Sequence, residues 1–334
     1  MTKLKTILKR ARTILVRFFF ALFTLYFFGA IYYNGPLGAG SFCNVALALL
    51  WLGLIIYLVR SKLSKKKKYG AIFATFIVVV IPWSMIPASN DRDWQAEFAE
   101  TSWVEVDGDT LTFHQCRNFI HSKDGSAEQW ETRTHHLSKL KGIDLFFDAF
   151  GGEVLAHPIV SFDFGDEGRL CLSVETRREK GESFSTIGGL YKMFDLQYIF
   201  GSEEDLVGVR TNIRNEPVFL YRLVYRPEHC RAFLMECIDT ANDLHKNPRF
   251  YNVISANCTT SYRAQTPKNK RNDFNWRMLI NGYFDSYLYE HKAFVTAGLS
   301  FDDYNQQAKI NKAANSVTER SQFSSAIREG RVGF

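Results

Sequence analysis

The sequence predicts a membrane protein whose soluble part is an α+β domain, and three patterns carry this prediction. Uncharged apolar stretches fill most of the chain up to about residue 90. Alternating apolar and polar residues, typical of half-buried strands, then recur from Val104 to Tyr225. An amphipathic helical pattern follows at 227–245. We therefore expect three N-terminal transmembrane helices followed by an antiparallel sheet flanked by helices.

The membrane helices follow from the distribution of charge. No Asp, Glu, Lys or Arg lies between Arg17 and Arg60, and a segment rich in Gly and Pro at 34–41 divides this stretch. Because a span needs about 20 apolar residues, we expect helices near 14–33 and 43–59, and a third over the uncharged run 69–86. A cleaved signal peptide is excluded, since it would contain a single short apolar run.

The basic residues predict the orientation of these helices. The chain up to residue 90 contains twelve Lys and Arg residues and no acidic ones, and they gather before the first apolar stretch and at 60–68. Basic loops stay on the cytoplasmic side. The N-terminus is therefore expected in the cytoplasm of a bacterium and the chain after the third crossing of the inner membrane in the periplasm. We expect an anchor at 1–88, a periplasmic domain at 89–305 and a polar C-terminal tail at 306–334.

The charge balance of the soluble part excludes some functions. Of the 41 Lys and Arg residues, 29 remain after residue 90, against 35 Asp and Glu. This mildly acidic balance argues against a nucleic-acid partner. Six Cys residues are too few for a disulfide scaffold of this length. His114 and Cys116 could share a strand face, but zinc needs further ligands and no CxxC or HExxH pattern occurs. We expect neither a metal nor a cofactor.

The elements of the soluble part can be placed from periodicity and turn residues. Asp107-Gly108 marks a hairpin within 104–113, and a second hairpin joins the strands expected at 157–164 and 170–176. Further strands are expected at 130–137, 142–150, 195–200 and 217–225, a short helix at 94–101 and a long helix at 227–245. Asn257 is a typical N-cap residue, so another helix should begin at or near Cys258.

Cys258 is the candidate nucleophile, because a helix start carries partial positive charge that stabilises a thiolate. A single Cys is more often a small buried residue, and this alternative stays open. His157 is the candidate base, since it begins a strand after a glycine pair and its ring would project at the sheet edge. A third group must hold the ring. Glu175 is favoured, with Ser173 and Asp163 as alternatives.

Several motifs in the soluble part follow one another in a characteristic order. They are Cys116-Arg117-Asn118-Phe119, Gly151-Gly152, Ala156-His157-Pro158-Ile159-Val160-Ser161-Phe162-Asp163-Phe164, the segment 173–182, Phe250-Tyr251-Asn252, Asn257-Cys258-Thr259-Thr260 and Leu279-Ile280-Asn281-Gly282-Tyr283. Over about 110–300 they resemble the periplasmic domain of the Lnb-type lipoprotein N-acyltransferases. That family in turn resembles the circularly permuted, NlpC-like papain fold, in which the His precedes the Cys.

The resemblance implies roles for particular residues. It makes Cys258 the nucleophile and His157 the base, with Glu175 as the favoured third residue. Four more residues are candidates for contacts with the substrate or the oxyanion, namely Asn257 and Thr259, which flank the thiol, and Arg117 and Arg177, which fall in motif positions. Pro158 departs from the family pattern, in which a Thr or another small polar residue would be expected.

Three functions are compatible with these features. The resemblance implies a thiol-dependent acyltransferase that moves an acyl chain from a phospholipid donor to the N-terminal amine of a lipoprotein acceptor. The papain-like layout alone also allows a hydrolase, such as a cell-wall amidase, a peptidase or a phospholipase. The third hypothesis is a non-catalytic envelope scaffold, in which Cys258 would be unreactive. The oligomeric state is left open.

Overall fold

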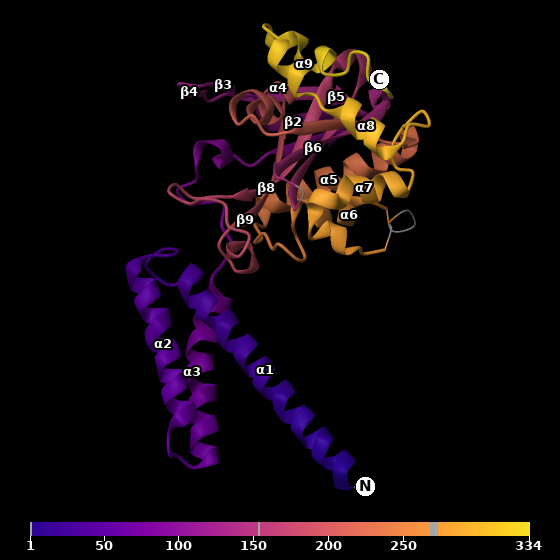
Figure 1. The fold of residues 1–334 in the computed structure, drawn as a ribbon. Coiled ribbons are helices and arrows are strands. Elements are labelled where there is room, and N and C mark those ends of the chain that lie inside the picture. The colour runs from indigo at the N-terminus through magenta and orange to yellow at the C-terminus, as the bar shows by residue number, and fades with distance from the viewer. Residues whose placement is uncertain (1, 153, 268–270, 272) are drawn as a thin grey trace. The chain divides into compact units, whose positions relative to one another are not determined.

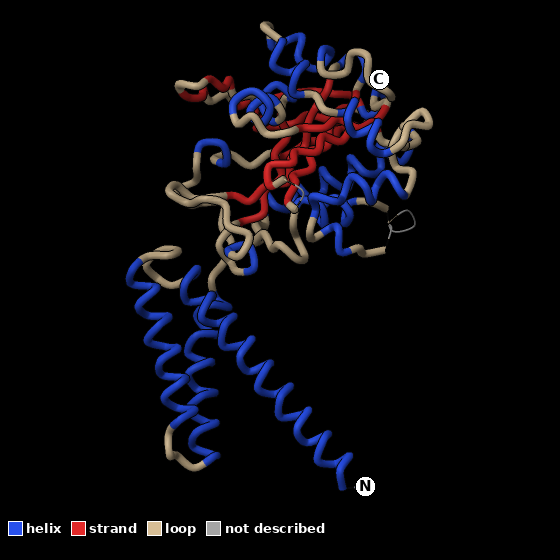
Figure 2. Tube along the Cα trace, viewed as in Figure 1, coloured by secondary structure: helices blue, strands red, loops and turns tan. Residues whose placement is uncertain are grey.

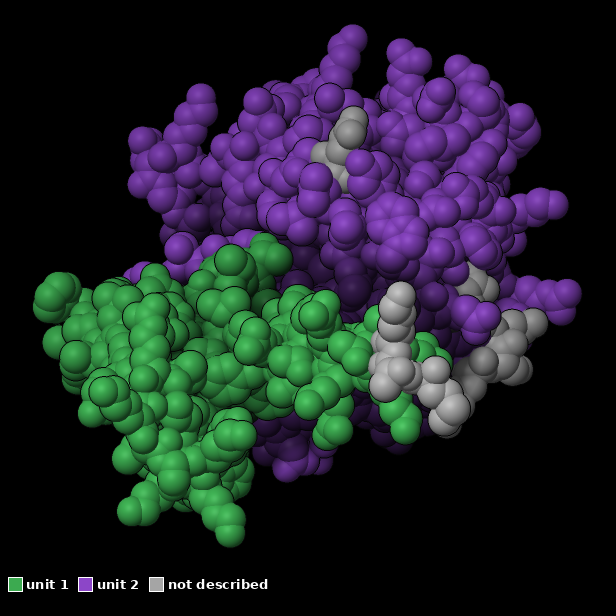
Figure 3. Space-filling model, turned by 60° about the horizontal axis from the view of Figure 1, so that its bottom comes forward, with its two compact units in different colours: residues 1–88, 185–194 green, residues 89–184, 195–334 purple. Residues whose placement is uncertain are grey.

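The computed structural model describes residues 2–152, 154–267, 271 and 273–334 (Figure 1). The chain forms two compact units (Figure 3). The first contains residues 1–88 and 185–194, and the second contains 89–184 and 195–334. The second unit therefore includes the sheet and all of the predicted site residues.

The first unit is built on three long helices, α1 (Thr2–Asn34), α2 (Phe42–Arg60) and α3 (Lys65–Met85). All three are long and apolar enough to cross a membrane, which confirms the three predicted spans. Helix α1 begins well before the predicted start near residue 14. Lys and Arg are good helix formers, so the basic segment before the apolar stretch continues the same helix.

A short segment from between two strands completes the first unit. Residues 185–194 contain the turn η4 (Gly188–Leu190), followed by Tyr191. The ring of Tyr191 lies 5.1 Å from the rings of both Tyr26 and Tyr33 on α1. Gly29 lies between these two tyrosines in sequence, and a Cβ atom there would collide with Tyr191. The missing side chain at Gly29 therefore makes room for this aromatic contact.

The second unit is organised around an eight-stranded sheet in the described part of the chain. The strand order is β1-β2-β9-β8-β7-β6-β10, with β5 also paired to β2, and every pair is antiparallel except a short parallel bridge between β2 and β9. The strands are β1 (Trp103–Asp107), β2 (Thr110–Arg117), β5 (Trp130–His136), β6 (Gly142–Gly151), β7 (Leu155–Asp163), β8 (Arg169–Arg177), β9 (Asp195–Gly201) and β10 (Val218–Arg222). A separate hairpin pairs β3 (Ile120–Ser122) with β4 (Gly125–Ala127). The two predicted hairpins, β1–β2 and β7–β8, are confirmed.

Helices lie on both faces of this sheet (Figure 2). One group contains α5 (Pro227–Lys246), α6 (Cys258–Gln265) and α7 (Phe284–Glu290). Tyr262 of α6 donates a 2.6 Å hydrogen bond to the carbonyl of Leu172 in β8 and its ring lies against Phe233 of α5. The other group contains α4 (Glu203–Leu206), the π-helical turn η5 (Val209–Ile213), α9 (Asn311–Ser316) and α10 (Phe323–Ala326). Helix α8 (Phe301–Ala308) lies at the β10 edge, where Asn305 donates hydrogen bonds to Tyr221 of β10 and to Asp285 of α7.

Short 3₁₀ turns connect these elements. They are η1 (Ala96–Phe98), η2 (Leu137–Lys139), η3 (Gly165–Glu167), η7 (Trp276–Met278), η8 (Asn281–Tyr283) and η9 (Arg320–Gln322). The short helix predicted at 94–101 is the single turn η1. The predicted helices at 227–245 and at Cys258 are confirmed as α5 and α6.

The segment 306–334, expected as a polar C-terminal tail, packs against the sheet. Ile310, Phe323 and Ile327 are buried in the same apolar cluster as Phe146 of the sheet. The guanidinium of Arg328 is buried too, and it donates a 2.8 Å hydrogen bond to Asp144. Ile310, Phe323 and Ile327 point inward, and the polar residues between them hide the pattern in the sequence.

This packing predicts that the C-terminal segment stabilises the domain. Replacing Phe323, which is 4% exposed, by Ala should lower the free energy of unfolding by about 3 kcal/mol, as expected for a buried Phe. The measurement is chemical denaturation of the full chain in detergent. Phe274→Ala is the matched control, because Phe274 is 55% exposed. Equal stability of the two variants would contradict the packing described above.

Candidate active site

The thiol of Cys258 stands at the first position of α6, where a capping box fixes the start of the helix. The side chain of Asn257 accepts a 2.7 Å hydrogen bond from the backbone N–H of Thr260, and Thr260 Oγ1 accepts a 2.9 Å bond from the backbone N–H of Asn257. Asn257 also donates to the carbonyls of Val253 and Met278. The sequence Asn-Cys-Thr-Thr thus places the sulfur at the positive end of the helix.

The imidazole of His157 lies on β7 and is held by two groups of β8. Its Nε2 atom is 2.7 Å from Ser173 Oγ and 3.1 Å from Glu175 Oε1. Ser173 donates a 2.6 Å hydrogen bond to the same carboxylate oxygen, so its own oxygen accepts from Nε2–H. The Nε2 atom is therefore occupied, and Nδ1 is the ring nitrogen left to serve another group.

Electrostatic interactions favour the charged forms of both His157 and Glu175. Burial works against the imidazolium, but the negative charge of Glu175 and hydrogen bonds to Cys258 and Glu175 raise the pKa of His157 from 6.5 to about 9. Burial also works against the carboxylate, yet the charge and hydrogen bond of His157, together with Arg210, hold the pKa of Glu175 well below 4.5. At neutral pH the pair is an imidazolium–carboxylate ion pair.

Arg210 fixes the carboxylate from the other side. It belongs to the π-helical turn η5, and its Nη2 atom donates a 3.0 Å hydrogen bond to Glu175 Oε1. Its Nε atom lies 2.9 Å from Asp148 Oδ2, and its Nη1 donates to the carbonyl of Leu206. Asp148 is the partner of His157 in the register of β6 and β7. A chain of paired charges, from His157 through Glu175 and Arg210 to Asp148, therefore holds Glu175 where the imidazole meets it.

Polar groups surround the sulfur of Cys258. Cys258 is close enough to His157 to contribute to the raised pKa of that imidazole. Asn281 Nδ2 lies 3.5 Å from Sγ and 3.3 Å from Thr259 Oγ1, while Asn281 Oδ1 accepts a 2.9 Å bond from the backbone N–H of Ala156. Burial raises the pKa of Tyr251 well above its usual value, and the nearby Cys258 adds to this shift. The thiol is 6% exposed, but it lies in a polar setting rather than in apolar packing.

The structure thus brings together the three residues predicted for the chemistry, Cys258, His157 and Glu175. A thiol next to an imidazolium can form a thiolate, which is the nucleophilic form of sulfur. The imidazole can then move a proton between the sulfur and a reacting group, and the carboxylate holds the ring in place. This arrangement is suited to acyl transfer through a thioester.

Two of the predicted contact residues do not lie at this group. Arg117 forms a bidentate pair with Asp205, at 2.9 and 3.0 Å. Arg177 is fully buried and donates to the carbonyls of Phe98 and Ala99. Arg117 therefore ties β2 to α4, and Arg177 ties β8 to the segment at Phe98 and Ala99; the contacts described for the two guanidiniums include neither the thiol nor the imidazole.

The other candidates from the sequence differ in where the structure places them. The side chain of Asn257 is committed to the helix cap, and Thr259 is buried with its hydroxyl against Asn281. Asp163, the alternative third group, pairs with Arg169 and Arg222 at 3.0 and 3.1 Å and so belongs to a different ion network. Among the residues that the structure describes, no three His, Cys, Asp or Glu side chains are placed to hold a metal ion.

Three residues at the site were not singled out from the sequence for a role, Arg210, Tyr251 and Asn281. Tyr251 and Asn281 lie in motifs that carried the family resemblance, and this was the only signal that could have marked them. Arg210 lies in an irregular turn with no such signal.

The fold and the site define a membrane-anchored α+β protein with a thiol–imidazole–carboxylate group. Residues 126–280 match the family model described as the Lnb N-terminal periplasmic domain. This match confirms the resemblance seen in the sequence, since it falls on the same family. No curated protein and no solved structure matches the chain significantly.

The ion pair predicts how the thiol responds to loss of its carboxylate. In Glu175→Gln the imidazole loses the carboxylate that charges it and holds it in place, so the pKa of His157 should fall and the ring should no longer be oriented toward the sulfur. Alkylation of Cys258 by iodoacetamide at pH 7 should slow by about tenfold. Quantitative mass spectrometry of the Cys258 peptide from the full chain measures this rate. Glu179→Gln is the control, and an unchanged rate in Glu175→Gln would refute the coupling.

The raised pKa of His157 also predicts a pH dependence of stability. The unfolded pKa is about 6.5 and the folded pKa about 9, so the stabilisation by the charged ring is complete below pH 6.5 and is lost as the pH rises through 9. It amounts to about 3 kcal/mol at most. Thermal unfolding of the full chain in detergent should show a gap between wild type and His157→Gln that narrows from pH 7 to pH 10. A gap that is constant or widens would contradict the assignment.

Proposed function

We propose that this protein is a membrane-anchored cysteine acyltransferase that moves an acyl chain from a phospholipid to the N-terminal amine of a lipoprotein. The observation that carries the proposal is the grouping of Cys258 at the start of α6 with His157, whose Nε2 atom lies 3.1 Å from Glu175 and whose pKa Cys258 helps to raise. The match to the Lnb periplasmic domain supports lipoproteins as the class of acceptor. The three apolar helices support a lipid substrate, because they keep the domain at a membrane.

In the first half-reaction the thiolate of Cys258 attacks the ester carbonyl carbon of the phospholipid. The carbon–oxygen ester bond breaks, and the imidazolium of His157 gives its proton to the leaving oxygen. A lysophospholipid departs, and the acyl chain stays on the sulfur as a thioester. Glu175 keeps the ring oriented throughout and stabilises the imidazolium before the proton leaves.

In the second half-reaction the free α-amine of a diacylglyceryl-cysteine lipoprotein attacks the thioester. Neutral His157 takes a proton from the amine as the new amide bond forms. The carbon–sulfur bond breaks, and the thiolate of Cys258 is regenerated next to the imidazolium. The overall reaction needs no cofactor, because one ester bond is broken and one amide bond is formed.

The negative oxygen of each tetrahedral intermediate needs hydrogen-bond donors. Asn281 Nδ2 lies 3.5 Å from the sulfur, and Cys258 stands at the start of α6, the positive end of that helix. A donor of this kind contributes about 10²- to 10³-fold to the rate in other acyl-transfer sites. Asn281 is therefore the side chain that we assign to the oxyanion.

The same proposal includes the location of the protein. The basic segments before α1 and between α2 and α3 favour a cytoplasmic N-terminus in the bacterial inner membrane. The domain that follows α3 would then lie on the periplasmic side. Phospholipids and lipoproteins that await N-acylation are both present in the outer leaflet of that membrane.

Transfer to an amine rather than to water is favoured by the burial of the thiol. With 6% of Cys258 exposed, bulk water has little access to a thioester there. Purified full-length protein in nanodiscs, given phospholipid and a diacylglyceryl lipopeptide, should yield acylated peptide in excess of free fatty acid. An excess of fatty acid would favour the hydrolase instead.

The decisive variant is Cys258→Ala. It should reduce N-acylation of the lipopeptide by about a thousandfold or more, because no other group can carry the acyl chain. Mass spectrometry of lipoprotein N-termini from cells measures the same loss. Cys43→Ala is the matched control, since this cysteine is exposed on α2. Unchanged N-acylation in Cys258→Ala would overturn the proposed function.

A further inference from the structure

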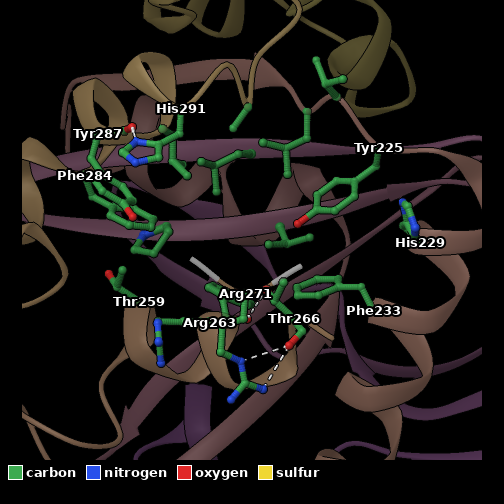
Figure 4. Close-up of a pocket in the computed structure, with 18 of the residues that line it drawn as sticks. Tyr225, His229, Phe233, Thr259, Arg263, Thr266, Arg271, Phe284, Tyr287 and His291 are labelled. Carbon is green, nitrogen blue, oxygen red and sulfur yellow. Dashed lines mark hydrogen bonds between the residues drawn. The ribbon is translucent and has the colours of Figure 1, made fainter. Parts of the chain in front are cut away.

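A second feature of the soluble unit is an apolar cavity beside the site (Figure 4). Its volume is about 550 Å³, within the range of about 300–1,000 Å³ that is usual for small-molecule sites. It lies among β6, β7, α5, α6 and α7, and much of its lining is apolar, including Leu145, Val160, Leu223, Phe233, Met278 and Leu288. It is therefore a site for an apolar chain rather than for a polar metabolite.

The cavity adjoins the reacting groups. Pro158 and Thr259 line it, whereas Cys258 and His157 do not. The side chain of His157 lies on the other face of β7 from Pro158, because successive residues of a strand alternate. The cavity meets the site through Thr259, since Asn281 Nδ2 lies 3.3 Å from Thr259 Oγ1 and 3.5 Å from Cys258 Sγ. A chain that ends at Thr259 would therefore have its polar end near the thiol. The second and fifth residues of α6, Thr259 and Tyr262, form one wall, so the helix that presents the sulfur also shapes the cavity.

The charged residues that line the cavity are all basic. They are Arg226, Arg263, Arg271 and Lys292, joined by His229 and His291, and no Asp or Glu lines the described cavity. Arg226, His291 and Lys292 are exposed. The chain after residue 90 is acidic on balance, so this concentration of positive charge runs against the composition of the domain. An apolar interior with a basic rim is complementary to an amphiphile with an anionic head.

We propose that this cavity holds the acyl donor, with a phospholipid acyl chain in the apolar interior and the lipid phosphate at the basic rim. This inference rests on the proposed function and assigns the phospholipid, one of the two proposed substrates, to this cavity. The positive charge of the rim distinguishes the phospholipid donor from the lipoprotein acceptor. A phospholipid carries a phosphate, whereas the lipoprotein acceptor presents an amine that is cationic until it is deprotonated. The basic rim attracts the first and repels the second.

The test measures binding separately from transfer. The full chain with Cys258→Ser, which cannot turn over, is titrated in detergent with a fluorescent short-chain phosphatidylglycerol. Ala293→Phe fills the cavity from a residue that lines it, and Lys292→Glu reverses one charge at the rim. Each should weaken binding by about tenfold, and the effect of Lys292→Glu should shrink at high salt.

Lys123→Glu is the matched control, because Lys123 is an exposed lysine in the β3–β4 turn and does not line the cavity. The affinity of the Lys123→Glu variant for the probe should stay within about twofold of the parent protein's affinity, because salt screens a distant charge. Equal affinity in Lys292→Glu and Lys123→Glu, with Ala293→Phe unchanged, would overturn the inference. The inference would also be overturned if a diacyl lipopeptide displaced the fluorescent probe at a lower concentration than unlabelled phosphatidylglycerol does. Thermal unfolding checks that both cavity variants are folded.

Transfer assays on the Cys258-intact protein separate this inference from the proposed function. Normal N-acylation in Ala293→Phe would contradict the donor site while leaving the acyltransferase standing. Phospholipid binding that depends on the cavity, in a wild-type protein that acylates no lipopeptide, would contradict the acyltransferase instead.

Discussion

The site depends on one physical constraint, which is that the charge on His157 must be balanced inside the fold. Glu175 supplies the anion, and Arg210 ties that carboxylate to Asp148. Charges are stable in such a setting only when each one is paired with good geometry, and the loss of one partner costs several kcal/mol. Three neighbouring strands and the turn η5 must therefore be assembled before the imidazole can be held as a cation. The sheet acts as the frame that places this group against the start of α6.

Much of the fold could be predicted from local patterns. The two hairpins follow from alternation and turn residues, and helix α6 follows from Asn257 as an N-cap residue before Cys258. The C-terminal segment could not be predicted in the same way. Ile310 and Phe323 are separated by mainly polar residues, so no periodicity indicates that both enter the core beside the sheet. Their burial depends on tertiary contacts that local periodicity does not encode.

The site was predictable only in part, and for a similar reason. Cys258 and His157 carry recognisable chemistry and sit in motifs, so they could be paired before any geometry was known. Arg210 supports the site from a π-helical turn, a conformation that no local pattern announces. Arg177 illustrates the reverse error, since it lies in a motif yet its guanidinium binds the carbonyls of Phe98 and Ala99. A motif locates a residue in the family pattern but does not say whether that residue serves the fold or the chemistry.

The central claim is that the sulfur of Cys258 carries the acyl chain between donor and acceptor. The most direct measurement is the mass of the full chain after incubation with phospholipid in the absence of any lipoprotein. The account predicts an added acyl mass on the peptide that contains Cys258, which neutral hydroxylamine removes and which is missing in His157→Ala. A protein that acylates lipopeptide with Cys258 chemically blocked, and without any such adduct, would contradict it.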